Sequence, residues 1–79
     1  MNSYYYAYQV TEVLLAQVVL IRPLGRLSLE EVRAIRHQMD DVSDFDCCYL
    51  YTFSDEADYR RHLEKEGQIY ESKERVIYA

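Results

Sequence analysis

The sequence predicts an α+β fold: a small mixed β-sheet, with elements in the order β-β-α-β-α-β along the chain and two helices packed on one face. Three observations predict this fold. Aromatic residues alternate along residues 3–10, a helix-capping pattern begins at Ser28, and an apolar-aromatic run over residues 46–53 is followed by a second capping residue, Ser54. Because a chain of 79 residues forms one domain at most, we expect residues 1–79 to be a single domain.

The first strand is expected over residues 3–10, where side chains alternate between two sides. One side carries Tyr4, Tyr6, Tyr8 and Val10, and the other carries Tyr5, Ala7 and Gln9. Such alternation with many aromatic residues is typical of a strand. We expect a weak break at Thr11 and Glu12.

Residues 13–22 are compatible with two structures. As a helix, the segment would have Thr11 as its N-cap and Pro23 just beyond its end. As a strand it would be buried on both faces, and its valine and isoleucine content favours this second interpretation. One long bent strand over residues 3–22 is a further alternative. Residues 23–25 are expected to form a turn because they contain Pro and Gly.

The first helix is predicted to start at Ser28, which is followed three residues later by Glu31 in a capping-box pattern. Leu27 and Val32 occupy the positions of a hydrophobic staple around this cap. The apolar stripe of the helix consists of Leu29, Val32, Ile35 and Met39. We expect the helix to end near Asp40 and Asp41, where acidic side chains oppose the helix dipole.

The next strand is predicted over residues 46–53, parallel to the strand over residues 13–22 because a helix connects the two. Ser54 is expected to cap a second helix that ends at Gly67, since glycine is common just after a helix. We expect the tail, residues 68–79, to be a strand or a hairpin that turns at residues 72–74. In an alternative interpretation the second helix continues through Gly67.

Negative charge is concentrated in one window of the chain, residues 38–59. The chain has 14 acidic and 9 basic residues, and this window holds seven of the acids and no Lys or Arg. We call these seven residues the acidic rim: Asp40, Asp41, Asp44, Asp46, Asp55, Glu56 and Asp58. They either keep a small protein soluble or face a partner. We predict that all seven contribute to partner binding.

The formal net charge of −5 argues against direct binding of nucleic acid, which needs a basic face, and against binding to an anionic membrane. The longest apolar stretch, residues 13–21, is too short to span a bilayer, and no signal peptide is visible at the N-terminus. Cys47 and Cys48 point to opposite faces of the predicted strand and make a poor disulfide with each other. We therefore expect reduced cysteines and a cytoplasmic protein.

Catalytic apparatus is sparse in this sequence. There is no glycine-rich phosphate loop, and the spacing of Cys47, Cys48, His37 and His62 does not suggest a catalytic pair. The aspartates near residue 40 lack the glycine and final glutamate of an EF-hand loop. We predict that the protein is not an enzyme and that it takes no cofactor and no metal.

Residues 50–66, LYTFSDEADYRRHLEKE, resemble the strand-to-helix corner of dimeric α/β-barrel proteins such as the small antibiotic-monooxygenase-like domains. The resemblance covers about a fifth of the chain, and the predicted order of elements departs from that family by an extra early strand. It implies an alternative function, a small dimeric ligand-binding or monooxygenase-like domain. No site residue is transferred from it.

We predict a non-enzymatic protein-binding domain. Its size and acidity resemble those of small inhibitors made by phages and other mobile elements. Acids spaced along a compact scaffold imitate a nucleic-acid backbone, so the expected partner is a nucleic-acid-handling protein with a basic groove. Because the core is small and the chain has nine tyrosines, we also expect a homodimer through the edge or the face of the strand over residues 3–10.

Overall fold

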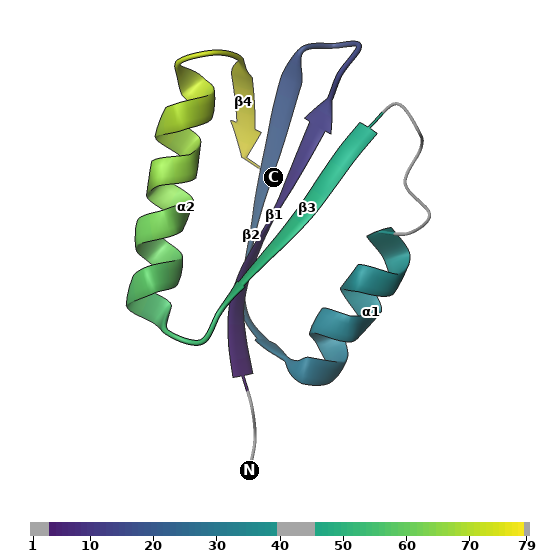
Figure 1. The fold of residues 1–79 in the computed structure, drawn as a ribbon, viewed down its shortest axis with the longest axis vertical. Helices are drawn as coiled ribbons and strands as arrows, with labels where there is room; N and C mark the ends of the chain where they lie inside the picture. The colour runs from purple at the N-terminus through teal and green to yellow at the C-terminus, as the bar shows by residue number, and fades with distance from the viewer. Residues whose placement is uncertain (1–3, 40–45, 79) are drawn as a thin grey trace.

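A computed structural model describes residues 4–39 and 46–78 of the chain (Figure 1). The elements are β1 (Tyr4–Val13), β2 (Val18–Ser28), α1 (Leu29–Met39), β3 (Asp46–Phe53), α2 (Glu56–Glu71) and β4 (Arg75–Tyr78). This confirms the predicted α+β class and the order β-β-α-β-α-β. The four strands form one mixed sheet in the order β3-β1-β2-β4.

Strand β1 lies in the interior of the sheet and runs antiparallel to both of its neighbours, β2 and β3. Strands β2 and β3 are therefore parallel to each other, as predicted, with β1 between them. The short β4 pairs with the outer edge of β2 in parallel. Both edges of β1 are paired within the chain over residues 6–13, so a dimer contact through an edge of this strand is wrong there, and a contact through its face stays a prediction.

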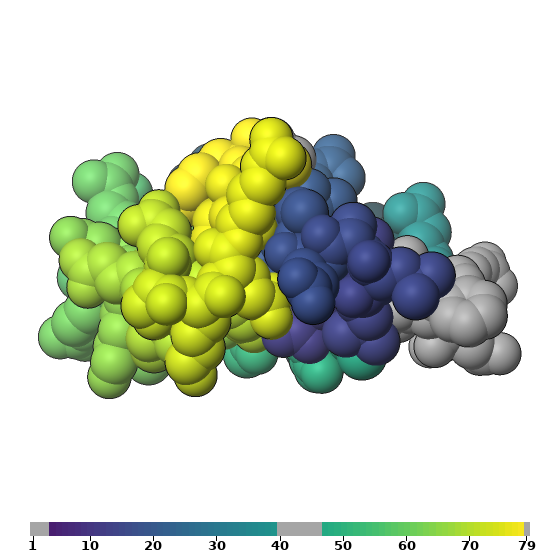
Figure 2. Space-filling model, turned by 90° about the horizontal axis from the view of Figure 1, so that it is seen from above, coloured from purple at the N-terminus to yellow at the C-terminus, as the bar shows by residue number. Residues whose placement is uncertain are grey.

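The two helices pack on opposite faces of the sheet, so the expectation that both lie on one face is wrong. Figures 1 and 2 show α2 on one side of the strands and α1 on the other. On the α2 side the core contains Tyr8, Val10, Val19, Ile21 and Tyr59, and on the α1 side it contains Ala7, Leu27 and Val32. Tyr8 and Ala7 are neighbours on β1 and both are buried. Successive side chains point to opposite faces, so each face needs its own helix to bury them.

A bulge in β2 explains how the side chains of one strand pack against both helices. The pairing register with β1 shifts between Ala7 and Tyr8, which leaves Leu24 as an extra residue opposite them. The shift reverses the alternation, so that Ile21 faces α2 whereas Leu27 faces α1. Gly25 has φ of 71°, a left-handed conformation that glycine adopts without a steric penalty. The turn predicted at residues 23–25 is therefore a bulge inside a strand.

The chain reverses between β1 and β2 at residues 14–17, not at Thr11 and Glu12 as predicted. Residues 13–22 are accordingly not one strand: Val13 ends β1 and Val18 begins β2. Gln17 supplies the left-handed residue of the turn, with φ of 54°. The sequence offered no Gly or Asn here, which is why the turn was missed.

Both helix starts are capped by side chains. At α1 the capping box is confirmed: the Glu31 N–H donates to Ser28 Oγ and the Ser28 N–H donates to Glu31 Oε1, both at 3.2 Å. Leu27 and Val32 are buried in one cluster, as a staple requires. At α2 the N-cap is Asp55 rather than the predicted Ser54.

Helix α2 does not end at Gly67 but continues to Glu71, which agrees with the alternative interpretation. The expected strand over residues 68–79 is limited to β4. Gly67 is buried, and a Cβ at this position would lie well inside van der Waals contact of the Tyr78 hydroxyl. Glycine is present here so that β4 can approach the helix closely, and not to terminate the helix.

Candidate protein-interaction surface

The structure describes only part of the acidic rim. Asp40, Asp41 and Asp44 lie outside the described residues, and of Asp46 only the backbone position at the start of β3 is described. The other three acids, at positions 55, 56 and 58, lie together at the start of α2. Their role in binding stays a prediction.

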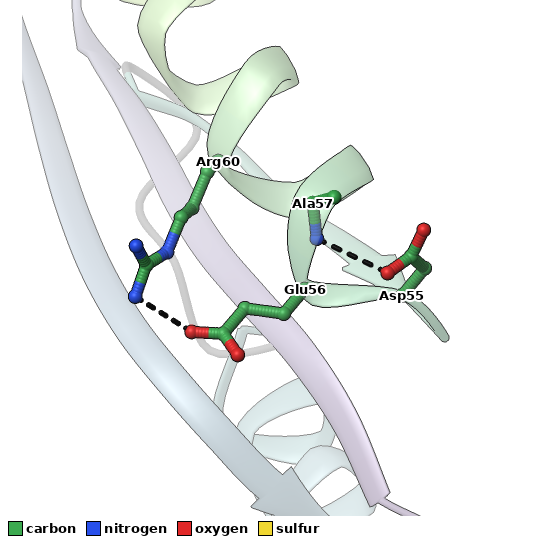
Figure 3. Close-up of polar contacts among 4 residues, drawn as sticks. All are labelled: Asp55, Glu56, Ala57 and Arg60. Atoms are coloured by element: carbon green, nitrogen blue, oxygen red, sulfur yellow. Dashed lines mark hydrogen bonds and ion pairs between the residues drawn. The ribbon is translucent and has the colours of Figure 1, made fainter.

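These three acids have local partners at the start of α2, and Figure 3 shows the partners of Asp55 and Glu56. Asp55 Oδ1 accepts the N–H of Ala57 at 3.1 Å, which caps the helix. Glu56 forms an ion pair with Arg60 at 2.7 Å, and Asp58 forms one with Arg61. Acids in the first turn also suit the helix dipole. Folding therefore accounts for these three residues without a partner protein.

A second group of residues on the α2 side of the sheet is rich in tyrosine. Tyr49, Tyr51 and Phe53 project from β3, and the Tyr51 ring stacks on the buried Tyr8 with 5.1 Å between centroids. The Tyr49 ring lies 6.4 Å from that of Tyr51 and is 42% exposed. The aromatic packing thus extends from the core to solvent at the outer strand of the sheet.

Two carboxylates lie beside these tyrosines. Glu12 Oε1 accepts a hydrogen bond from the Tyr70 hydroxyl at 3.1 Å, and Glu12 lies opposite Cys47 in the β1–β3 register. Glu66 is half-buried on the inner face of α2, near enough to Tyr8 and Tyr51 to affect their ionisation. Among the described residues, no Lys, Arg or His forms an ion pair with either carboxylate.

We define the tyrosine–glutamate surface as Glu12, Tyr49, Tyr51, Glu66 and Tyr70. Burial raises the pKa of Tyr51 and of Tyr70, and Glu66 and Glu12 raise both further. The hydroxyls therefore stay protonated at neutral pH and remain hydrogen-bond donors. With two carboxylates and the exposed Tyr49 side chain, this surface suits a cationic group of a partner.

The fold already contains one contact of this kind. The guanidinium carbon of Arg26 lies 4.6 Å from the centroid of the Tyr4 ring. A cation held over a tyrosine face is stabilised by the ring quadrupole, more strongly where water is excluded.

Sequence analysis missed both glutamates, although a signal exists for each. Glu12 continues the alternation of Tyr8 and Val10, which places it on the same side of the strand as these two residues. The prediction of a break at Thr11 and Glu12 overlooked this. Glu66 falls in the inner stripe of α2, with the spacing of one helix face: Tyr59, Leu63, Glu66 and Tyr70. An acid in an apolar stripe is unusual and could have been flagged.

A small cavity of about 220 Å³ lies on the α1 side of the sheet. Its lining residues are Gln9, Arg22, Leu24, Ile35, Gln38 and Met39. Nearby, the Cys48 thiol contacts Gln9 Nε2 at 3.3 Å and Thr11 Oγ1 at 3.4 Å. None of the lining residues is a nucleophile or a general base at neutral pH. His62 stacks on Phe53, with 4.9 Å between ring centroids, and is also separate from this cavity.

Within residues 4–39 and 46–78, no three His, Cys, Asp or Glu side chains converge as a metal site would require. Neither of the described helices is long and apolar enough to cross a membrane. Comparison of the chain with protein-family models, with curated proteins and with solved structures finds no match.

Proposed function

We propose that this chain is a non-enzymatic, cytoplasmic domain that binds another protein with a basic surface. The observation that carries the proposal is the tyrosine–glutamate surface, where exposed Tyr49 lies near Glu12 and its neighbour Tyr51 lies near both Glu12 and Glu66. Neither Glu12 nor Glu66 forms an ion pair among the described residues. A cationic partner group would supply the missing counter-charge. The proposal includes no cofactor, no direct contact with nucleic acid and no membrane.

The chemistry of this surface supports a protein partner. Tyrosine is enriched at protein interfaces because it offers a large apolar ring and a hydroxyl at low entropic cost. Carboxylates at the edge of such a patch steer basic partners toward it and exclude acidic ones. The net charge of −5 adds a long-range attraction for the same class of partner.

Within this class we favour a nucleic-acid-handling protein, which the chain would inhibit by occupying its basic groove. Asp40, Asp41 and Asp44 would extend the contact as mimics of phosphates. The alternative, a ligand-binding or monooxygenase-like domain, is expected to surround an apolar pocket with tyrosine and histidine. The cavity on the α1 side contains neither residue type, so we place this alternative second.

The test begins with capture of partners from the native host on immobilised protein, followed by affinity measurements with the purified partner. Two charge variants, Glu12→Gln and Glu66→Gln, and the ring variant Tyr49→Ser are compared with wild type at low and high salt. Glu64→Gln is the matched control, since it removes one charge from an exposed position on α2. Circular dichroism checks that each variant is folded.

We expect the three surface variants to weaken binding by about tenfold each, because each removes ~1–2 kcal/mol of charge or ring contact. The control should change affinity less than twofold. Salt should reduce the affinity of wild type more than that of the charge variants. Equal affinity for all four variants at both salt concentrations would refute the proposed surface.

A further inference from the structure

Strand β3 is an outer strand of the sheet, and it borders the tyrosine–glutamate surface. Its only neighbour among the described strands is β1. In an antiparallel pair, alternate residues direct their backbone N–H and C=O groups toward the partner strand, and the others direct them away. About half of the backbone groups of β3 therefore face outward, where no described strand pairs with them.

Outer strands usually carry features that prevent further pairing, such as charged side chains, proline, bulges or short length. Residues 47–53 of β3 contain no charged residue, no Pro and no Gly, and their pairing with β1 continues without a register shift. The opposite outer strand differs, because β4 has only four residues. Both outer strands begin with a charged residue, Asp46 in β3 and Arg75 in β4, but of the two described outer strands β3 has the longer neutral run and is the one that suits an added strand.

We propose that the β3 edge binds an extended segment of the partner protein as a fifth strand, with Arg or Lys at alternate positions on the α2 side. The inference rests on the proposed function and specifies how the partner is bound. Backbone hydrogen bonds to β3 would hold the segment, and the tyrosine–glutamate surface would select its side chains.

The spacing of strands allows both contacts at once. An added strand would lie ~4.8 Å from β3 and ~10 Å from β1. Its alternate side chains on the α2 side would lie beside Tyr49 and Tyr51, the outermost tyrosines of the surface. A long basic side chain crossing the exposed Tyr49 ring would extend toward Glu12, which lies opposite Cys47 on β1.

Charge complementarity favours a basic segment over a second copy of this chain. Two copies paired through β3 would bring together strands that have no Lys or Arg at residues 47–53. Such a pair would leave Glu12 and Glu66 without counter-charges. A basic segment supplies those charges and the backbone groups together.

The experiment uses a short capped peptide in which arginine alternates with valine and threonine, titrated into the isotope-labelled protein. Two control peptides separate the contribution of charge from that of strand formation. In the first, proline replaces valine and threonine, which keeps the charge and removes the ability to form a strand. In the second, glutamate replaces arginine, which keeps the strand and reverses the charge. Amide hydrogen exchange of residues 47–53 reports on pairing at the β3 edge.

We expect the arginine–valine/threonine peptide to bind and to slow exchange at alternate amides of β3. Both control peptides should bind at least about tenfold more weakly. The double variant Glu12→Gln/Glu66→Gln should weaken binding of the arginine peptide by a similar factor. The control variant Glu64→Gln should leave the binding of this peptide unchanged.

Three results would overturn the inference: no binding of the arginine peptide, equal binding of the proline peptide, or binding without slowed exchange in β3. A dimer of the free protein with β3 amides already protected would identify a second copy as the occupant instead. The proposed function is judged separately by the captured partner. If partner affinity depends on Tyr49 and Glu12 but the β3 amides stay unprotected, the function stands and strand addition fails.

Discussion

At the scale of single residues, Gly67 determines how closely β4 lies against α2. A glycine inside a helix costs ~1 kcal/mol relative to alanine, so its presence must be explained by packing. The nearest obstacle to a side chain is the hydroxyl of Tyr78, and the ring carbon behind that hydroxyl is 3.5 Å from the Cβ position. Removing the hydroxyl alone should therefore make room for a methyl group.

We predict that Gly67→Ala stabilises the protein by ~1 kcal/mol in a Tyr78→Phe background, where the helix propensity of alanine is gained in full. In wild type the gain should be smaller by at least ~0.5 kcal/mol, because the Tyr78 ring must move. Urea denaturation of the four proteins in this cycle measures the coupling. Strictly additive effects would show that the contact has no energetic consequence.

Tyr8 provides a second prediction at this scale, which concerns pH. Burial raises the pKa of Tyr8 well above its ordinary value, and Glu66 raises it further. Between pH ~10 and the folded-state pKa, the unfolded chain loses this proton and the folded chain keeps it. The stabilisation is therefore complete below pH ~10 and is lost as pH rises above it.

The expected loss is at most ~1.4 kcal/mol per pH unit from this one group. Tyr8→Phe should reduce the decline in unfolding free energy between pH 9 and pH 11 relative to wild type. Denaturation midpoints at both pH values measure this difference. The same decline in wild type and Tyr8→Phe would contradict the assignment.

At the scale of elements, capping fixes the start of α1. Ser28 and Glu31 satisfy each other's backbone N–H groups. We predict that Ser28→Ala lowers the free energy of unfolding by ~0.5–2 kcal/mol and that Ser28→Thr, which keeps the hydroxyl, costs little. Thermal or urea denaturation distinguishes the two variants. An unchanged midpoint for Ser28→Ala would mean that tertiary packing alone holds this helix start.

The elements that were predictable are those with local signals. The α1 start follows from the capping box, and the bounds of β3 follow from an alternating run between acidic segments. The turn at residues 14–17 has no Gly, Asn or Pro to mark it, and Gly67 is explained by the close approach of Tyr78 rather than by a helix end. The first boundary lacks a local signal and the second position depends on a contact between distant residues, so sequence analysis placed both boundaries wrongly.

At the scale of the whole molecule, the sheet separates two chemical environments. Its α2 side holds the stacked tyrosines with Glu12 and Glu66, and its α1 side holds smaller apolar residues and the cavity. Sequence alternation assigned the β1 tyrosines to the correct side. It could not bring Glu66 next to them, because that contact depends on which face α2 covers.

Six of the seven residues of the acidic rim form two groups of three acids each, and this allows a comparison of variants matched in charge. We predict that changing Asp40, Asp41 and Asp44 together to Asn leaves stability unchanged or slightly raised and weakens partner binding several-fold. The matching triple variant, Asp55→Asn with Glu56→Gln and Asp58→Asn, should instead lower the free energy of unfolding by ~0.5–1 kcal/mol. It loses two ion pairs and the favourable charges at the start of α2.

Each triple variant removes three negative charges, so a purely long-range effect on a basic partner would be the same for both. Such an effect would also weaken as salt shortens the Debye length, which is ~10 Å at 0.1 M. A larger loss of affinity for the first variant, persisting at high salt, would indicate direct contact through residues 40–44. If neither variant changes affinity at either salt concentration, the acidic rim contributes to solubility and not to partner binding. Partner binding would then depend on the tyrosine–glutamate surface alone.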